Sequence, residues 1–512
     1  MNFMHRIRNA YLRILSAIMA FAMLSAFMAS CGTPTEGTDG QGTETSNEAV
    51  SEVETTEKIS HSLPESLDYA EDEVTIISRY REGWTSGEIA VEKITNEPVN
   101  DAVYARNLAV EEELNVKIKS IEENNNDPTV VMSNISTNIK SGAGDYDIVA
   151  CAAYVTVNEA LSGTFADLRK TQYLDFDKPY WSQGYNEVIQ YGGTQYTVTG
   201  SMVLSLYRFA FITTFNKRLF TEHQVAFPYD AVRNGEWTLD YQTSLVTTFH
   251  HDDDGTPDDK NDIYGLVTSP YISTDPYWSS CDVPIVGRTE DGGYEIIFET
   301  EKLFNVAEKV LTLYYGTENA TYSYEHYGLD DEQNDIRRMF SVGHAAMSTL
   351  RIMELESGDM RQMEDEFGVL PMPKYDTNQQ GYKTLLHDQF TVIAIPTTVT
   401  GERLDQMSAV LECMAAEGHN LVRPAYYESA LRYKYMKDPE SWEMMDIIIN
   451  NIYIDAGIIY TNALSSFHDQ FRQIVTKKTN TVASDYKSKS KQAVKTLERM
   501  TKKLDTLVKR GS

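Results

Sequence analysis

Residues 127–152, DPTVVMSNISTNIKSGAGDYDIVACA, decide the fold class of this chain. Asp127 is a residue type that caps helices and Pro128 suits the first helical position, so a helix is predicted to begin there. Its apolar face consists of Val131, Ile135 and Ile139. Two glycines end the helix, and residues 147–152 follow as a short, almost wholly apolar run. Such a run is typical of a parallel strand that is covered on both faces.

The preceding segment supplies a neighbour for that strand. Val74–Ser78 is a short apolar run that indicates a strand, and Asn100 is predicted to cap the helix that follows it. The apolar side of this helix includes Val103, Val110 and Leu114. Val116, Ile118 and Ser120 then alternate as a second strand. The order strand, helix, strand predicts a βαβ unit and hence an α/β fold.

The N-terminus has the features of an export signal. Residues 1–30 hold three arginines and no acidic residue, and their apolar run is too short and too early for an ordinary membrane span. Met28-Ala29-Ser30-Cys31 resembles the lipobox of bacterial lipoproteins, although Met28 departs from the usual leucine or valine. The resemblance implies lipidation of Cys31. The alternative is a signal peptide that is cut elsewhere, with Cys31 an incidental thiol.

A tether is predicted between this cysteine and the folded body. Residues 31–73 are rich in Gly, Thr, Ser, Glu and Asp, with few large apolar side chains. Such a composition cannot bury enough surface to offset the entropy lost on ordering. We therefore expect a flexible coil that holds the body off a membrane while letting it diffuse around its anchor.

Charge and cysteine spacing exclude several classes of protein. The chain has 45 basic and 76 acidic residues, a formal net charge of −31, which disfavours nucleic acid and anionic lipid as partners. The cysteines at 31, 151, 281 and 413 are far apart and form no C-x-x-C pair, so they suggest neither a zinc site nor a disulfide framework. Cys151, Cys281 and Cys413 are expected to be mostly free and buried. The alternative is that two of them form one disulfide.

Motifs along about 400 residues resemble the extracellular solute-binding proteins of bacterial ABC importers, specifically their long lipoprotein branch in Firmicutes. The motifs are weak singly, and their order and spacing carry the resemblance. They include Val74–Ile77, Val99–Asn107, Gly144–Val149, Asp167–Leu168 with Tyr173–Asp175, Lys178–Trp181, Thr213–Phe220, Phe340–Met347, Asp365–Tyr375 and Pro424–Tyr427.

The resemblance implies an α/β, two-lobed periplasmic-binding-protein-like fold of type II, with the ligand in a cleft between lobes that close by hinge bending. The first lobe is expected at 74–211 and 349–394, and the second at 212–348 and 395–480. The chain is expected to cross between lobes near 211–216, 347–350 and 392–396. Residues 481–512 are expected to form a C-terminal amphipathic helix, docked on a lobe or, alternatively, bound to a membrane.

Aromatic residues are the main candidates for the ligand site. The chain has 32 tyrosines, and aromatic residues make up 11% of it, more than a core of this size requires. Tyr and Trp stack on the flat faces of sugar rings, while polar side chains bind the hydroxyls. By the family's layout, the candidates are Tyr80, Trp84, Tyr154, Tyr271, Tyr277, Trp278, Tyr460 and Phe467, together with Arg351 for hydroxyls or a carboxylate. For each aromatic residue the alternative role is packing in the core.

A calcium loop is a further possibility at residues 252–262, DDDGTPDDKND. Carboxylates clustered around a glycine turn can wrap a hard cation, and the stretch resembles a shortened version of the calcium loop of relatives. The candidate ligands are Asp252, Asp254, Asp258 and Asn261. Calcium would have a structural role here, and the alternative is a solvated acidic turn.

The resemblance implies a substrate-capture lipoprotein rather than an enzyme, and no cofactor is expected apart from that calcium. It would act as a monomer, bind a soluble ligand such as an oligosaccharide and deliver it to ABC permease subunits. Lipid at Cys31 would hold it at the cell surface, on the outer face of the cytoplasmic membrane. The chain contains no Walker A, G-x-S-x-G or H-E-x-x-H motif. Two alternatives stay open: a surface carbohydrate-active enzyme, and a ligand sensor for a membrane kinase.

Overall fold

The computed structural model describes residues 58–249, 262–297, 300–316, 320–323, 332–428 and 438–511. The chain divides into residues 1–57 and a compact unit, residues 58–512. The predicted signal peptide, Cys31 and the acidic loop with Asp252, Asp254, Asp258 and Asn261 lie outside the described residues. Among the residues described, no helix is both long and apolar enough to cross a membrane.

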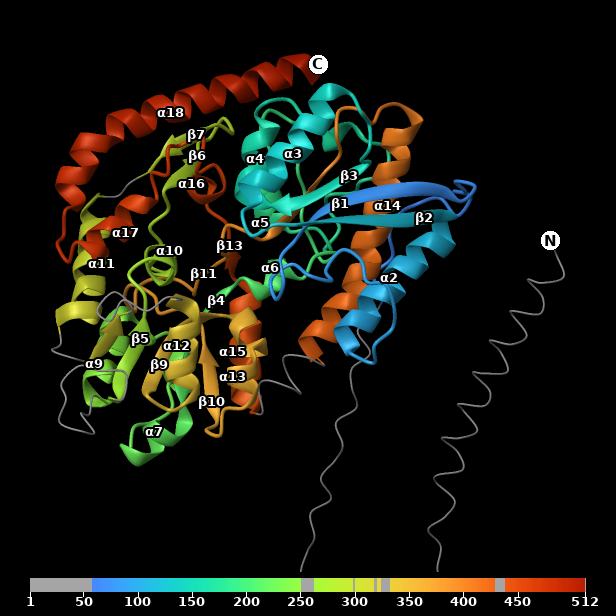
Figure 1. Ribbon diagram of the computed structural model, residues 1–512. Helices are drawn as coiled ribbons and strands as arrows, with labels where there is room; N and C mark the ends of the chain where they lie inside the picture. The colour runs from blue at the N-terminus through green and yellow to red at the C-terminus, as the bar shows by residue number, and fades with distance from the viewer. Residues whose placement is uncertain are drawn as a thin grey trace, which may run out of the picture. The chain divides into compact units, whose positions relative to one another are not determined.

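The first lobe is built on a four-stranded sheet (Figure 1). Its strands, in spatial order, are β12 (Thr391–Ala394), β3 (Ile148–Ala152), β1 (Asp72–Tyr80) and β2 (Val116–Asn124). The strands β1, β2 and β3 are parallel, and β12 is antiparallel to β3. Every residue of β3 is buried, which confirms the sequence-based prediction of a covered parallel strand.

Two helices complete the predicted βαβ units of this lobe. Helix α2 (Pro98–Leu114) links β1 to β2, and its cap is Glu97 rather than the predicted Asn100. The Glu97 carboxylate accepts hydrogen bonds from the first backbone N–H groups of the helix. Helix α3 (Pro128–Ser141) begins as predicted, with the Asp127 side chain accepting from Thr129 N, and ends at Gly142 in the left-handed conformation.

The second lobe is built on a five-stranded mixed sheet. Its strands, in spatial order, are β10 (Phe367–Leu370), β4 (Phe211–Asn216), β9 (Ala345–Arg351), β5 (Tyr264–Thr268) and β8 (Thr321–Ser323). The strands β9, β5 and β8 are parallel, whereas β4 is antiparallel to both of its neighbours. Packed on this sheet are α7 (Lys217–Glu222), α9 (Leu239–Phe249), α12 (Glu332–Ser341) and α15 (Pro439–Asn450).

Further helices and two small sheets make up most of the rest of the compact unit. The helices are α4 (Ala153–Ala160), α5 (Gln183–Ile189), α6 (Ser205–Arg208), α8 (Tyr229–Arg233), α10 (Asp275–Ser280), α11 (Thr300–Leu311), α13 (Gly358–Arg361), α14 (Glu402–Glu417), α16 (Ala456–Ile459) and α17 (Asp469–Thr476). Two small sheets pair β6 (Val286–Arg288) with β7 (Tyr294–Ile296), and β11 (Thr384–Leu385) with β13 (Ile452–Tyr453).

The division of the later sequence between the lobes differs from the prediction. Residues 349–394 were expected in the first lobe, yet only β12 of that segment joins the first sheet, because β10 pairs with β4 in the second. Residues 395–480 were expected in the second lobe, yet α14 packs against α2 in the first. The crossing expected at 347–350 is wrong. That stretch is the end of β9, a central strand whose residues are all buried, and an apolar run looks the same in either role.

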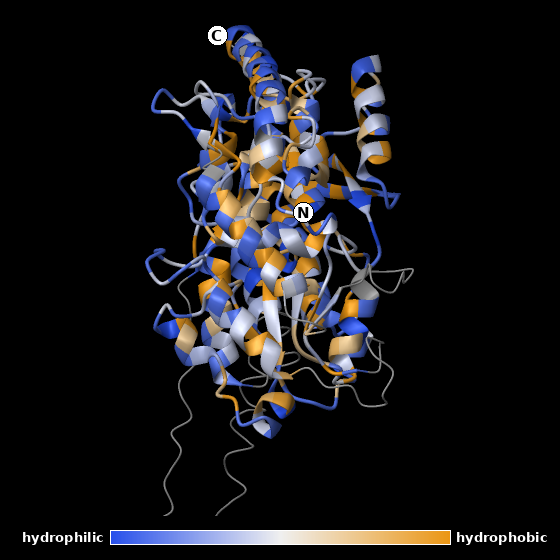
Figure 2. Ribbon diagram, turned by 90° about the vertical axis from the view of Figure 1, so that its left-hand side faces the viewer, coloured by the Kyte–Doolittle hydropathy of each residue, from blue (hydrophilic) through white to orange (hydrophobic). Residues whose placement is uncertain are grey.

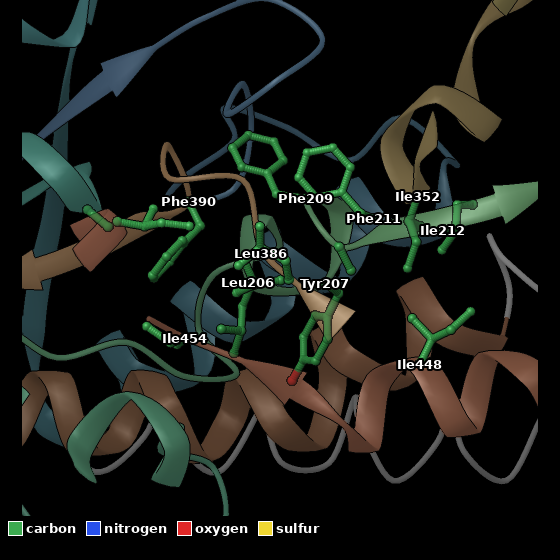
Figure 3. Packing of buried hydrophobic residues seen from close by; sticks show 14 of the residues in the cluster. Leu206, Tyr207, Phe209, Phe211, Ile212, Ile352, Leu386, Phe390, Ile448 and Ile454 are labelled. Carbon is green, nitrogen blue, oxygen red and sulfur yellow. The ribbon is translucent and has the colours of Figure 1, made fainter. Parts of the chain in front are cut away.

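Two crossing segments lie side by side between the lobes. His387 N donates to Phe209 O at 3.0 Å, and Ile352 N donates to Ala210 O at 3.0 Å. Figure 3 shows apolar side chains of both segments in one buried cluster, which includes Leu206, Tyr207, Phe209, Phe211, Leu386 and Phe390. A third passage, between α14 and α15, runs partly outside the described residues. Because both lobes share this cluster, the crossing segments form one continuous core with them.

The three cysteines within the compact unit are free and buried, as the spacing predicted. Burial raises the pKa of the Cys151 thiol to about 12 and that of Cys281 to about 12. Both thiols are therefore protonated at neutral pH and act as small apolar side chains.

Residues 58–71 pack against the first lobe, although the sequence placed them in the flexible tether. Asn420 exchanges two hydrogen bonds with the backbone of Ile59, at 3.0 and 2.9 Å. The His61 imidazole contacts the Glu113 carboxylate on α2 at 3.0 Å, and Lys58 pairs with Glu417 on α14 at 2.9 Å. The tether prediction is therefore wrong for this stretch, whose partly buried apolar side chains are Ile59, Leu63 and Leu67.

A pair of truncations tests this packing. A chain that begins at Lys58 should unfold with the same free energy as the chain that begins at Gly32. Starting at Asp72 should lower the free energy of unfolding by roughly 2–4 kcal/mol, because several partly buried apolar side chains are removed. Urea denaturation measures the free energy of unfolding of both truncated chains. Equal stability of the two truncated chains would contradict the packing.

The C-terminal helix α18 (Val482–Gly511) docks on the compact unit along its apolar side. Its buried side chains are Ala493, Leu497, Met500, Leu504 and Leu507. It packs against α11 and β7 at one end, while Tyr191 of the first lobe donates to Asp505 at 2.7 Å near the other. Figure 2 shows hydrophobic and hydrophilic residues alternating along this helix up to the C-terminus. Docking on the chain itself, rather than on a membrane, accounts for its amphipathic pattern.

Two substitutions on α18 distinguish the loss of its packing on the compact unit from a change in helix propensity alone. Leu504 is 4% exposed, whereas Val494 on the same helix is 45% exposed. Leu504→Ala should lower the free energy of unfolding by about 2–3 kcal/mol through the cavity it leaves. Val494→Ala should change it by less than about 0.5 kcal/mol. Thermal or urea unfolding measures the free energy of unfolding of each variant. Similar losses of stability in both variants would contradict the docking.

Candidate ligand-binding cleft

A cavity of about 660 Å³ lies between the two lobes, within the size range of ligand pockets. It opens where β1 of the first sheet and β9 of the second end, next to the crossing segments. Ligand sites of α/β proteins are commonly found at the carboxyl ends of strands. The lining residues are Arg81, Glu82, Gly83, Trp84, Arg208, Ile272, Arg337, Arg351, Met353, Glu354, Glu356, Ser357, Arg361, His387 and Gln389.

The loop after β1 presents Trp84 to this cavity. Trp84 N and Thr85 N both donate to Arg81 O, at 3.0 and 3.1 Å, and this closes a tight turn. Gly83 has φ +69°, a conformation that residues with a side chain rarely adopt. Thr85 Oγ1 donates to Arg79 O at 2.9 Å and ties the turn to the end of the strand. The turn is therefore held by its own hydrogen bonds.

Arg208, on the crossing segment, joins this loop to the second lobe. Its guanidinium donates to Trp84 O at 2.6 Å and to Gly83 O at 2.9 Å. It also donates to both carboxylate oxygens of Glu356, at 3.0 and 2.9 Å. Burial alone would lower the pKa of Arg208, but the adjacent Glu356 carboxylate raises it above its ordinary value. Arg208 is thus charged and fully engaged in positioning the cleft walls.

The Trp84 indole is surrounded by groups from both lobes. The Arg81 guanidinium carbon lies 3.5 Å from the ring centroid, and that of Arg351 lies 4.5 Å from it. Phe209 and His387 approach the indole edge-to-face, with centroids at 5.3 and 5.5 Å. Two cations from opposite lobes therefore contact one aromatic ring.

Arg351 is the last residue of β9 and is only 1% exposed. Its Nε and Nη2 donate to Glu354 Oε1 at 3.1 and 2.5 Å, and its backbone N–H donates to Glu354 Oε2 at 2.7 Å. Its Nη1 is buried without a hydrogen-bond partner in the described part of the chain. A buried guanidinium N–H of this kind retains the capacity to bind one more acceptor.

The second crossing segment contributes His387 and Gln389. Gln389 Oε1 accepts a hydrogen bond at 2.9 Å from Arg79, a buried residue at the end of β1. Burial, together with the positive charges of Arg351, Arg472, Arg81 and Arg79, lowers the pKa of His387 well below its ordinary value. His387 is therefore neutral at physiological pH.

Of the candidate ligand residues, the structure brings Trp84 and Arg351 together at the cavity. Tyr80 lies at the end of β1 and its hydroxyl donates to Glu82, while Tyr154 is half-buried in the first turn of α4. Tyr271 is 41% exposed beside Ile272, which lines the cavity. These three are near the cleft without lining it.

The other candidates lie in the core. Tyr277 and Trp278 belong to the buried helix α10 rather than to the expected loop, and Tyr277 Oη shares a hydrogen bond with Thr349 Oγ1 at 3.1 Å. Tyr460 and Phe467 are 2% and 5% exposed and line small cavities beneath the C-terminal elements. The positions of all four match the packing role that the sequence left open.

Several lining residues were not among the candidates, and most of them are charged. They include Arg81, Arg208, Arg337, Glu354, Glu356, Arg361, His387 and Gln389. One signal was available: Arg81 follows the first predicted strand directly, at the place where ligand residues are expected. Arg208 comes from the first crossing segment, and the others come from segments 332–361 and 386–389, which only the true strand order brings to the cleft.

Comparison with known proteins finds similarity between this chain and solved structures. No protein-family model matches the chain, and no curated protein matches it. A sugar transporter protein of Rhizobium etli in an open conformation has a TM-score of 0.55 at 18% identity, with 84% of this chain and 99% of that chain covered.

Two further solved structures match over a similar share of the chain. The galacto-N-biose-/lacto-N-biose I-binding protein of a Bifidobacterium longum ABC transporter, in complex with lacto-N-biose, has a TM-score of 0.54 at 13% identity, with 84% and 98% covered. An ABC substrate-binding protein of Listeria monocytogenes, in complex with cycloalternan, has a TM-score of 0.51 at 13% identity, with 85% and 99% covered. The chain therefore has the two-lobed α/β fold of the extracellular solute-binding proteins of ABC sugar transporters.

Proposed function

We propose that this protein is the substrate-capture subunit of an ABC importer, which binds a soluble saccharide between its lobes and delivers it to a membrane permease. The observation that carries the proposal is the interlobe cavity of about 660 Å³, to which both lobes and both described crossing segments contribute side chains. It is a binding protein in this proposal, and the ligand leaves it unchanged.

Capture would follow from differential affinity for two conformations. A ligand that touches Arg81 and Trp84 of the first lobe together with Arg351 and Met353 of the second gains all of its contacts only when the lobes are closed. It therefore shifts an existing equilibrium between open and closed forms toward the closed one. The crossing segments that share the hydrophobic cluster would act as the hinge.

A saccharide is the ligand class that the cleft chemistry and the structural relatives support. The cavity lining combines the Trp84 indole with guanidinium, amide and carboxylate groups, and these polar groups suit the hydroxyls of a sugar. The Bifidobacterium longum and Listeria monocytogenes proteins were each solved with an oligosaccharide bound, lacto-N-biose and cycloalternan. At such low identity these ligands indicate the class of molecule and not its identity.

Binding and turnover are distinguished by one experiment. The protein is incubated with a panel of glycans, and its melting temperature is measured alongside chromatography of the glycans. A ligand present at a hundredfold excess over its Kd should stabilise the protein by about 2.7 kcal/mol and be recovered intact. Trp84→Ala should weaken binding by roughly tenfold or more, whereas Tyr104→Ala, on α2 away from the cavity, should leave it unchanged. Glycan cleavage would identify an enzyme instead, and no stabilisation by any saccharide would overturn the proposal.

The location is proposed from the N-terminal sequence. Export with lipid on Cys31 would keep the binding protein at the outer face of the cytoplasmic membrane, where a permease can receive the ligand. Cys31→Ser should release the protein from the membrane fraction into the medium of a Gram-positive host, without changing glycan binding. Fractionation with immunodetection measures this. Membrane retention of the variant equal to that of the wild type would contradict a lipid anchor at Cys31.

A further inference from the structure

We infer that His61, Glu113 and Cys413 form a binding site for Zn²⁺ on the first lobe, apart from the ligand cleft. Among the described residues, these three are the one group of at least three His, Cys, Asp or Glu side chains whose potential ligand atoms converge, all within 4.8 Å of one another. None of the three lines the interlobe cavity. The role of the cation is structural, because it holds residues 58–71 on α2 and α14.

Three segments that are far apart in the sequence bring these side chains together. His61 belongs to the stretch 58–71, Glu113 lies in the last turn of α2, and Cys413 lies in α14. The two helices pack against each other. The spacing of the cysteines did not indicate a zinc site, because Cys413 is 300 residues away from the carboxylate that its sulfur contacts.

The distances between the ligand atoms are close to those around a tetrahedral cation. His61 Nε2 lies 3.0 Å from Glu113 Oε1, and Cys413 Sγ lies 3.6 Å from Glu113 Oε2. Zinc bonds of about 2.0–2.3 Å place the ligand atoms of a tetrahedral site about 3.3–3.8 Å apart. The Glu113 side chain is 44% exposed and can make the small rotation that admits the cation between the three groups.

The set of ligand types favours zinc over the hard cations. A thiolate, an imidazole and a carboxylate are the ligands of protein zinc sites, and three of them leave the fourth tetrahedral position to water. Ca²⁺ and Mg²⁺ prefer oxygen ligands and bind poorly to sulfur. The Cys413 thiol gives up its proton to solvent when the sulfur binds the cation. The His61 ring can then carry its proton on Nδ1, where only a long contact of 3.4 Å from Leu63 N is lost.

Contacts just before His61 hold this residue at the site. Lys58 pairs with Glu417 at 2.9 Å, and Asn420 exchanges two hydrogen bonds with the backbone of Ile59. Glu417 lies on α14, one helical turn from the cysteine, so the N-terminal stretch is attached directly beside the thiol. Ligands that are already in position lose little conformational entropy when the cation binds.

Cys413 differs from the other buried thiols in its surroundings. All three cysteines of the compact unit are 0% exposed, yet the Cys413 sulfur contacts a carboxylate that reaches solvent. A cation can therefore approach the sulfur past Glu113. Cys151 and Cys281 belong to no such group among the described residues, and they offer matched controls.

Titration with ZnCl₂ alone tests the site in a chain that begins at Gly32. Calorimetry should show one tight site per chain above the weak binding of surface carboxylates, and the melting temperature should rise as zinc is added. Excess Ca²⁺ should not displace zinc from this site. Co²⁺ bound to the same ligands should give the thiolate-to-metal absorption in the near ultraviolet that reports a bound sulfur.

Variants locate the cation at the three residues. His61→Gln, Glu113→Gln and Cys413→Ser should each weaken zinc binding by roughly a hundredfold or more, because the loss of an outer-shell partner alone costs 10–100-fold. Glu112→Gln removes the neighbouring exposed carboxylate of α2 and should bind zinc as the unchanged chain does. Cys281→Ser removes a buried thiol elsewhere and should keep both zinc binding and the cobalt absorption.

The outcomes separate this inference from the proposed function. If Cys413→Ser and Cys281→Ser bind zinc alike, or if Co²⁺ gives no thiolate absorption, the inference is overturned. Glu113→Gln changes an exposed side chain, so its comparison with Glu112→Gln decides the matter even if a substitution at Cys413 unfolds the chain. Saccharide binding should be the same in all of these variants, and its absence would overturn the proposed function without touching the zinc site.

Discussion

The ion pair between Arg208 and Glu356 is the interaction on which the arrangement of the cleft depends. Arg208 lies on the crossing segment, and its guanidinium holds the Gly83 and Trp84 carbonyl groups of the first lobe as well as the Glu356 carboxylate of the second. Arg208 is 8% exposed, so removing either partner would leave a charge in a poorly solvated place. One side chain thereby couples the loop that presents Trp84 to the lobe across from it.

Much of the first lobe follows from local sequence signals. The cap at Asp127 with Pro128, the left-handed Gly142 and the apolar run of β3 are chemical features that act within a few residues of themselves, and each is present as predicted. The later sequence offers no such guide. The end of β9 is as apolar as a crossing strand, and only its pairing with β4 and β5 shows that it belongs to the middle of the second sheet.

The same dependence on contacts between distant residues explains which ligand residues could be predicted from the sequence. Trp84 and Arg351 come directly after or at the end of strands, so their position could be inferred from strand order. Tyr277 and Trp278 have equally suitable side chains, but α10 buries them, and burial is decided by residues far away in the sequence. Residues 58–71 show the converse case. Their polar composition suggests a coil, while three well-placed apolar side chains and the Asn420 hydrogen bonds order them.

The cleft contains charged side chains that are paired within the protein. Arg351 is 1% exposed and Glu354 is 3% exposed, so neither charge is well solvated and each depends on the other for compensation. Glu356 and Glu354 thus fix the positions of Arg208 and Arg351, and they balance the charge of both guanidinium groups next to the crossing segments.

The packing of residues 58–71 on α2 and α14 also determines how force passes through the molecule. A force applied at the N-terminus would act on the hydrogen bonds of Ile59 with Asn420 and on the contact of His61 with Glu113. All of these contacts lie within the first lobe. The second lobe is connected to the first through the crossing segments, and α18 contacts both α11 and Tyr191. If the chain is anchored through its N-terminus as proposed, the first lobe would stay in place when the lobes rotate and the second lobe would move.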